Sequence, residues 1–235
     1  MRRPRGYDPN VVATLDTPSL AALVERAARL VVPGERHILG IAGPPGAGKS
    51  TLAEALVAAL DARLGAGTAV LVPMDGFHLP NEELVRIGLR DRKGAPETFD
   101  AEGFVRLLRR LRANEDPEVR APRFDRSAEA SIPGAIAVPR TAALVVTEGN
   151  YLLLDDGPWA EIRPLLDEAW HLAADEGRVE RLIARHIAHG KAPDRARDWV
   201  HRSDEANARL VMSSAGAADI LVLGLPRLSE DRDGT

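Results

Sequence analysis

Short uncharged apolar runs alternate with longer segments of helical periodicity along most of the chain. Apolar runs of a few residues are typical of strands buried on both faces of a parallel sheet. Segments in which apolar residues recur every three or four positions are typical of amphipathic helices that cover such a sheet. The pattern predicts an α/β fold with strands at about residues 38–41, 69–72, 142–147, 168–173 and 218–223, and helices at about 18–32, 52–64, 100–111, 179–187 and 194–211.

The spacing of these elements divides the chain into parts. Residues 1–16 are polar and aperiodic, so we expect a flexible N-terminal arm, and residues 226–235 are expected to form a C-terminal tail. Thr17 followed by Pro18 predicts the N-cap and first turn of the first helix. The gap between the second and third strands is far longer than a crossover requires. We therefore expect one domain over residues 17–225, with an insertion at about 76–140.

The first predicted strand leads into GPPGAGKST and then directly into a helix-forming run. This segment matches G-x-x-x-x-G-K-[ST] in the strand–loop–helix context that makes a P-loop. Glycines let backbone N–H groups turn toward phosphate oxygens, the lysine reaches the β- and γ-phosphates, and the hydroxyl can bind Mg²⁺. The alternative is a glycine-rich turn that binds nothing. We expect a nucleoside triphosphate to be bound by Gly43, Pro44, Pro45, Gly46, Ala47, Gly48, Lys49, Ser50 and Thr51, with Lys49 also catalytic and Ser50 also a metal ligand.

Two acidic residues follow predicted strands at the sheet edge where open α/β folds bind ligands: Asp75 leaves the second strand and Glu148 ends the third. A carboxylate at Asp75 can accept the proton of an incoming hydroxyl during phosphoryl transfer. Glu148 can hold Mg²⁺ directly or through water. The alternatives are a turn or N-cap role for Asp75 and a solvent-facing acid at Glu148.

Basic side chains recur on one side of the helix after the fourth strand, where Arg178, Arg181 and Arg185 are spaced i, i+3 and i+7. Such arginines can close over phosphates and neutralise developing charge, although a solvated basic face explains the pattern equally well. His186 lies on the apolar stripe and is expected to pack. The insertion adds polar groups that could hold an oxygen-rich acceptor or simply be surface charge. These acceptor candidates are His78, Asn81, Arg90, Lys93 and Arg123.

Composition narrows the class of protein. A net charge of −4 and 4% aromatic residues offer neither a positive field nor stacking platforms for nucleic acid. The absence of cysteine excludes disulfides, thiolate metal sites and a cysteine nucleophile. No apolar stretch approaches the roughly 20 residues that span a bilayer, and no apolar core follows the first arginines as in a signal peptide. We expect a cytoplasmic protein whose partners include neither nucleic acid nor membrane.

Several motifs together resemble a known family. GPPGAGKST, MDGFHLPNEEL, RKGAPETFD, VVTEGNYLL and the RVERLIARH helix, within about residues 20–223, are similar to the phosphoribulokinase/uridine kinase superfamily and to its pantothenate kinase-like and fructose-transport-system kinase-like branch. The resemblance implies an ATP- and Mg²⁺-dependent kinase with a P-loop NTPase fold of three αβα layers, a five-stranded parallel sheet and a helical lid at about 175–195.

The same resemblance implies roles for individual residues. Asp75 matches an acid proposed as base or metal organiser, and Glu148 matches a Walker B-like acid. The lid arginines Arg178, Arg181 and Arg185 become candidates for ATP contacts, with Arg181 catalytic. Asn207 falls where related kinases have residues near the adenine, although an exposed polar residue on that helix is the favoured interpretation.

The resemblance does not extend to the acceptor. Uridine kinases carry P-x-Y-D-x-x-x-H-x-R, whereas PRFDRSAEAS has Phe124 in place of the tyrosine and no following histidine, which argues against uridine or cytidine. We expect a kinase that transfers the γ-phosphate of Mg·ATP to a hydroxyl of a small metabolite, such as a nucleoside, a sugar or a pantothenate-like compound, with a homodimer as the candidate assembly. The alternative is a nucleotide-hydrolysing switch or chaperone; a GTPase would need N-K-x-D, which the sequence lacks.

Overall fold

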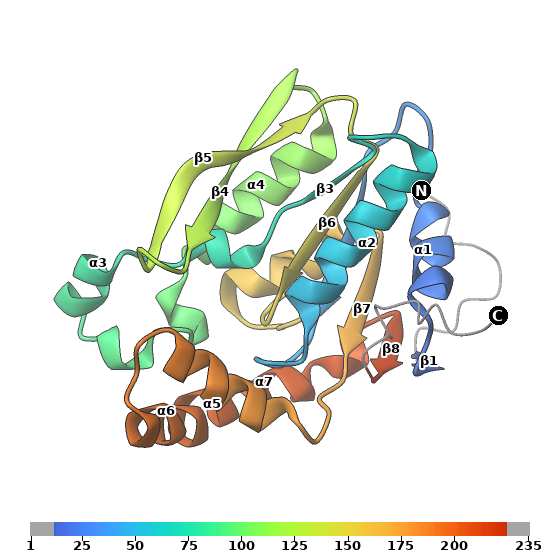
Figure 1. Ribbon diagram of the computed structural model, residues 1–235. Helices are drawn as coiled ribbons and strands as arrows, with labels where there is room; N and C mark the ends of the chain where they lie inside the picture. The colour runs from blue at the N-terminus through green and yellow to red at the C-terminus, as the bar shows by residue number, and fades with distance from the viewer. Residues whose placement is uncertain (1–11, 225–235) are drawn as a thin grey trace.

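A six-stranded parallel sheet runs through the centre of the computed structural model, which describes residues 12–224 (Figure 1). The strands follow the order β1-β8-β7-β2-β6-β3, and a separate antiparallel hairpin is formed by β4 and β5. Because β2 lies between β6 and β7, the P-loop that follows β2 leaves from the middle of the sheet. The strands are β1 (Ala13–Asp16), β2 (His37–Ala42), β3 (Ala69–Leu71), β4 (Glu118–Asp125), β5 (Ala130–Pro139), β6 (Leu144–Gly149), β7 (Glu168–Leu172) and β8 (Ile220–Leu223).

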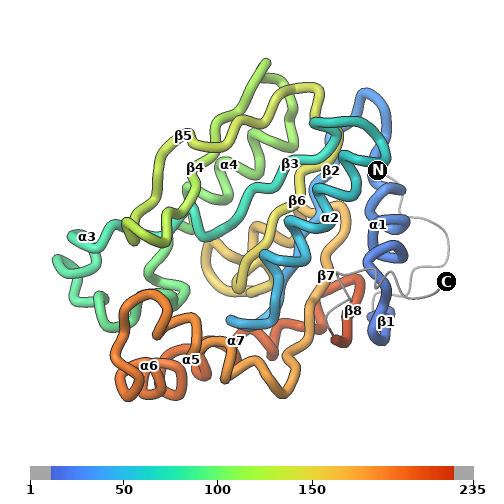
Figure 2. Tube along the Cα trace, viewed as in Figure 1, coloured from blue at the N-terminus to red at the C-terminus, as the bar shows by residue number. Residues whose placement is uncertain are grey.

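Two apolar cores, one on each face of the sheet, establish three αβα layers. Side chains alternate between the faces of a strand, so Leu144 and Val146 of β6 join the core beneath α1 and α2, whereas Val145 joins the core beneath α4. The tube view follows this layering along the chain (Figure 2). The predicted α/β class and P-loop topology are confirmed. The helices are α1 (Leu20–Ala28), α2 (Lys49–Leu64), α3 (Asn81–Arg86), α4 (Ala101–Ala113), α5 (Arg178–Ala188), α6 (Pro193–Trp199) and α7 (Glu205–Ser213).

The N-terminal part of the fold corrects two expectations. The parallel sheet has six strands rather than five because residues 13–16, which the sequence assigns to a loose arm, form the edge strand β1 against β8. This strand is short, pairs on one side only and contributes one half-buried apolar side chain, Leu15, so it has little apolar signal. The cap of α1 is Ser19 rather than Thr17, since the Ser19 hydroxyl accepts the N–H of Ala22. Residues 1–11 of the predicted arm and the tail 226–235 lie outside the described residues.

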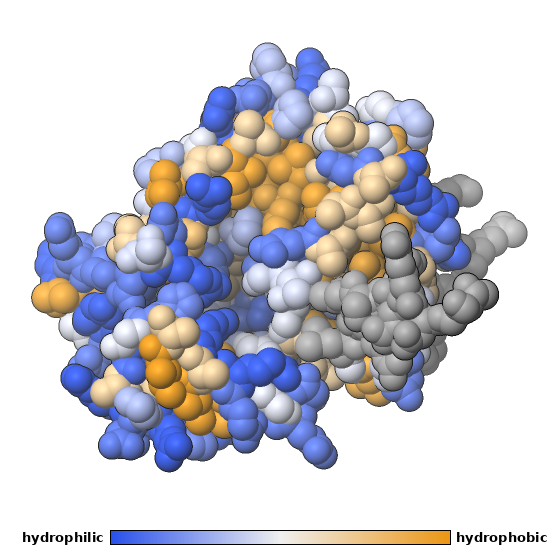
Figure 3. All heavy atoms as spheres, viewed as in Figure 1, coloured by the Kyte–Doolittle hydropathy of each residue, from blue (hydrophilic) through white to orange (hydrophobic). Residues whose placement is uncertain are grey.

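The long segment between β3 and β6 folds into two helices and the β4–β5 hairpin. Val119 of β4 pairs with Val138 of β5, and both are buried against the core that contains α4. The hairpin's other side chains are exposed or half-buried except for Ala121, so proline, arginine and small residues hide its period in the sequence. In the space-filling view, apolar atoms gather between this hairpin and α2 (Figure 3).

The segment after β7 returns across the P-loop as α5 and α6, then runs through a π-helical turn (Val200–Asp204) into α7. We call α5 and α6 the lid. Its packing on the P-loop and on α7 brings Arg178 of α5 together with Glu205 of α7. Between residues 12 and 224, no helix has the length and apolar character that crossing a membrane would require.

Candidate functional site

The P-loop forms a cradle of backbone N–H groups at the start of α2. Gly48 is the N-cap of α2 and adopts φ 90°, a left-handed conformation that favours glycine. Because Gly48 has no side chain to cap the helix, the first-turn N–H groups remain available to an anion. Gly46 is also left-handed, and a Cβ there would come within 2.7 Å of the Leu182 side chain on the lid. The loop therefore fits a polyphosphate and leaves room for the lid above it.

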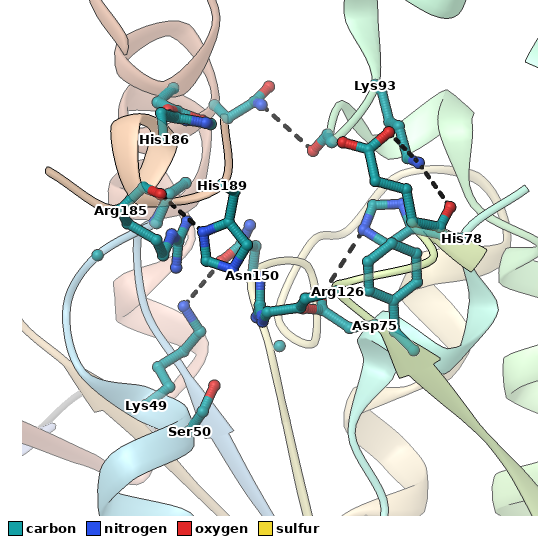
Figure 4. Close-up of a pocket in the computed structure, with 18 of the residues that line it drawn as sticks. Lys49, Ser50, Asp75, His78, Lys93, Arg126, Asn150, Arg185, His186 and His189 are labelled. Carbon is teal, nitrogen blue, oxygen red and sulfur yellow. Dashed lines mark hydrogen bonds and ion pairs between the residues drawn. The ribbon is translucent and has the colours of Figure 1, made fainter. Parts of the chain in front are cut away.

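Lys49 and Ser50 bring the charge and the hydroxyl into the pocket. The buried Lys49 Nζ donates to the Pro44 carbonyl at 3.1 Å and to Asn150 Oδ1 at 2.8 Å (Figure 4). Burial lowers the pKa of Lys49 to about 8, and the opposing charges of Glu148 and Asp75 limit this fall. The ammonium is thus a weakly hydrated cation that a phosphate would stabilise.

Ser50 and Glu148 form a pair that suits a hard cation. The Ser50 hydroxyl donates to Glu148 Oε1 at 2.9 Å, and Glu148 is 5% exposed. Burial and the nearby Asp75 charge raise the pKa of Glu148, so added positive charge would favour its carboxylate form. Among the described residues, no cluster of three acid or histidine side chains could hold a metal alone. These oxygens therefore fit Mg²⁺ in the way that it is held by a few protein ligands together with substrate phosphates.

Asp75 lies across the same pocket on the 3₁₀ turn Met74–Phe77 that follows β3. Its Oδ2 accepts a hydrogen bond from Arg126 Nη2 at 3.1 Å, and its Oδ1 is 3.9 Å from His78 Nε2. Since β3 and β2 both pair with β6 in parallel, their carboxyl ends meet at one edge. The two predicted acids, Asp75 and Glu148, are therefore brought into one pocket.

The insertion closes the far side of this pocket with aromatic and charged groups. The His78 ring stacks on Phe99 with centroids 4.0 Å apart and lies 4.8 Å from the Phe124 ring. Lys93 Nζ donates to Asn81 Oδ1 at 2.7 Å and to the Glu129 carbonyl at 3.1 Å. Thus His78 and Lys93 line the pocket.

The other acceptor candidates lie outside the pocket lining. Asn81 acts behind the lining as a partner of Lys93, and Arg90 pairs with Glu129 at 3.2 Å. Arg123 is exposed and belongs to neither the acceptor side nor the phosphate side of the pocket. The hairpin arginine that does enter is Arg126, three residues later, because the chain turns between β4 and β5 at that point.

The three lid arginines do different things. Arg178 is buried, donates to the Pro45 carbonyl at 3.1 Å and pairs with Glu205 of α7. Arg181 donates to the Gly46 carbonyl at 3.0 Å and pairs with Asp175. Arg185 also lines the pocket beside Lys49 and Ser50; although the residue keeps exposed surface, desolvation of its guanidinium and the Arg126 charge lower its pKa. Arg178 and Arg181 thus hold the P-loop through its carbonyls, and Arg181 and Arg185 both line the cavity beside Lys49 and Ser50.

Helix α7 connects the lid to the insertion. His186 packs in the lid as expected, with its Nε2 2.8 Å from Asp204 Oδ2. Asn207 is buried rather than exposed, and its Nδ2 donates to the Gly94 carbonyl at 3.2 Å. The same carbonyl accepts the Tyr151 hydroxyl. The interpretation of Asn207 as an exposed residue is therefore wrong, because the insertion covers that face of α7.

Several pocket residues were absent from the sequence-based set. Asn150 lies two residues after Glu148 in TEGN, with Gly149 between them, so the positions of both can be recovered from the strand end. The remaining ones depend on how the insertion and the lid fold back over the sheet. They are Gly94, Phe99, Phe124, Arg126 and Glu129 of the insertion and His186, His189, Lys191, Trp199 and Asp204 of the lid and the π-helical turn after it.

The environment of His78 predicts an acid-dependent loss of stability. Burial lowers the pKa of His78 from 6.5 to about 4. Between these two values the His78 ring is protonated in the unfolded chain and neutral in the folded protein. Stability should fall by about 3 kcal/mol from this group as the pH drops from 6.5 to 4. Urea unfolding at pH 7 and pH 4.5 should show a smaller acid loss in His78→Gln than in wild type. The exposed control His201→Gln should behave like wild type, and an equal loss in His78→Gln would contradict this account.

The chain is similar in sequence and in fold to known proteins. No protein-family model matches the chain. A Schizosaccharomyces pombe protein named "Putative uridine kinase C227.14" is 34% identical over 214 residues, which covers 88% of this chain and 91% of the relative. Among solved structures, a protein described as a "putative fructose transport system kinase" from Silicibacter sp. TM1040 is 39% identical with a TM-score of 0.78, covering 87% of this chain and 98% of that one.

A more distant structure shares the fold. Phosphoribulokinase from Rhodobacter spheroides is 18% identical with a TM-score of 0.58, over 84% of this chain and 74% of that one. The chain therefore belongs to the phosphoribulokinase/uridine kinase superfamily of P-loop kinases.

Proposed function

We propose that the protein is an ATP-dependent kinase that transfers the γ-phosphate of Mg·ATP to a hydroxyl of a small metabolite. One observation carries the proposal: a single pocket is lined by Lys49 and Ser50 on one side and by Phe124 and Lys93 on the other, with Asp75 between them. A nucleotide switch needs the first side only. Phosphoryl transfer to an alcohol also requires a second side of the pocket, which holds the acceptor next to a carboxylate.

The donor would be held by the P-loop N–H groups, Lys49 and Arg185. Ser50 and Glu148 would hold Mg²⁺, which when bound neutralises phosphate charge. Two hydrogen bonds hold the Lys49 ammonium in position, so it needs little reorganisation when negative charge develops on the transferred group. Asn207 donates one hydrogen bond to the Gly94 carbonyl and also lines the pocket, so its contact with the adenine stays a prediction.

In the transfer step, Asp75 acts as the general base. The acceptor oxygen forms a bond to the γ-phosphorus while its proton passes to the Asp75 carboxylate. The bond from the γ-phosphorus to the bridging oxygen breaks, and its electron pair stays on the departing ADP. The neutral His78 ring and Phe124 offer the acceptor an apolar surface beside this carboxylate.

The proposal is tested by a screen for acceptor-dependent ADP release. Purified protein is assayed with Mg·ATP against nucleosides, sugars, pantothenate and other alcohol-bearing metabolites, with Lys49→Ala as the blank. We expect ADP release on one chemical class and none in the blank. Uniform inactivity of folded protein that still binds ATP would favour the nucleotide-hydrolysing switch instead.

A further inference from the structure

Arg126 occupies a position that joins the two halves of the pocket. It lies in the turn between β4 and β5, residues 126–129. On one side it lines the acceptor cavity with Asp75 and Phe124, and on the other it lines a cavity formed by the P-loop and the lid arginines. The other residues shared by the two cavities all come from the P-loop and the lid, namely Gly46, Lys49, Ser50 and Arg185.

Most N–H donors of the Arg126 guanidinium have no hydrogen-bond acceptor among the described residues. Its side chain is 47% exposed, and within residues 12–224 its one hydrogen-bond acceptor is Asp75 Oδ2, reached through Nη2 at 3.1 Å. A guanidinium carries five N–H donors in a planar fork that matches two oxygens of a phosphate. Figure 4 shows Arg126 beside Asp75, between the Lys49 side and the His78 side of the pocket. The remaining donors are therefore available to a phosphoryl group between the two walls.

The local charges also favour an anion beside Arg126. Lys49, Arg185 and Arg126 converge on the same region, and the charge of Arg126 lowers the pKa of both Lys49 and Arg185. The opposing acids are Asp75 and Glu148, of which Glu148 is already engaged with the Ser50 hydroxyl. A transferred phosphoryl group would bring negative charge to this cluster.

We propose that Arg126 is a catalytic residue that exchanges partners: it moves from Asp75 to the transferred phosphoryl group. The Asp75 carboxylate is then free to accept the acceptor's proton. This inference rests on the proposed kinase function. A guanidinium that stayed on the carboxylate would stabilise its charged form and so oppose proton transfer. The exchange makes the base available only when a phosphate has drawn the arginine away, which couples donor binding to acceptor activation.

The first test uses a phosphoryl mimic and needs no acceptor. ADP binding with Mg²⁺ is measured by calorimetry with and without aluminium fluoride, which imitates the transferred group. We expect fluoride to tighten ADP binding in wild type and in Arg123→Ala, a matched arginine of the same hairpin that is exposed and outside both cavities. In Arg126→Ala the gain should be lost while binding of ADP alone is kept. An undiminished gain in Arg126→Ala, or no gain in wild type, would overturn the proposal.

The second test measures turnover with the acceptor that the screen selects. Arg126→Ala should lower kcat by about 10²–10³-fold with little change in KM for ATP, as expected when one donor to a transition-state oxygen is removed. Arg126→Lys should recover part of the rate, and added guanidinium chloride at millimolar concentration should partly rescue Arg126→Ala. If wild type turns over and Arg126→Ala turns over equally fast, the proposed role of Arg126 is refuted but the proposed kinase function is not. Absence of turnover in wild type would refute the kinase itself.

Discussion

Replacing Asp75 with asparagine is expected to lower kcat for acceptor phosphorylation by about 10²–10⁴-fold while ATP affinity changes little. The amide keeps the shape of the side chain and can still face Arg126 and His78, but it cannot take up a proton. Asp75 lies on the acceptor side of the pocket rather than in the P-loop, so the donor contacts through Lys49 and the loop N–H groups stay intact. Turnover and ATP affinity measured on the same preparation separate the two effects.

The same variant distinguishes a base from a metal organiser. If Asp75 acts as base, the loss should persist at every Mg²⁺ concentration; if it helps to hold the metal, high Mg²⁺ should restore much of the rate. Asp155→Asn is the matched control, because Asp155 is an exposed acid at a turn outside the pocket lining. A variant that transfers phosphate as fast as wild type would remove Asp75 from the mechanism.

The parts of the site that could be predicted are those fixed by local sequence and by the parallel sheet. The P-loop is contiguous, and its glycines adopt the left-handed conformations that the motif requires. Asp75 follows β3 and Glu148 lies at the carboxyl end of β6; because the two strands are parallel, the meeting of these distant residues at one edge follows from the fold class. Asn150 follows from Glu148 by the same reasoning.

The parts that could not be predicted depend on how the insertion folds back. Arg123 and Arg126 look alike in PRFDR, and only the turn between β4 and β5 decides that the second arginine enters the pocket. Asn207 shows the same limit on a helix: its face of α7 would be exposed in isolation, but the loop at Gly94 covers it. Edge strand β1 could not be predicted from the sequence, because a strand that pairs on one side only needs no apolar pattern.

Truncating Lys49 to alanine is expected to lower turnover by at least about 10²–10³-fold and to abolish most of the stabilisation that Mg·ATP gives to the folded protein. The ammonium is the buried cation of the P-loop, and no neighbouring lysine can replace it, since the chain's other lysines, Lys93 and Lys191, belong to the insertion and to the lid. Without nucleotide the unfolding temperature should change little, because loss of two hydrogen bonds is offset by relief of the charge's desolvation.

Thermal unfolding with and without saturating Mg·ATP measures this directly. Wild type should gain stability as ATP rises above its Kd, by about 2.7 kcal/mol at a hundredfold excess, and Lys49→Ala should gain far less at the same concentration. Arg63→Ala, at the exposed far end of the same helix, controls for general effects on α2 and should respond like wild type. An undiminished ATP response in Lys49→Ala would mean that the loop N–H groups and Arg185 carry the donor alone, and the charge at Lys49 would then have to act only in the transition state.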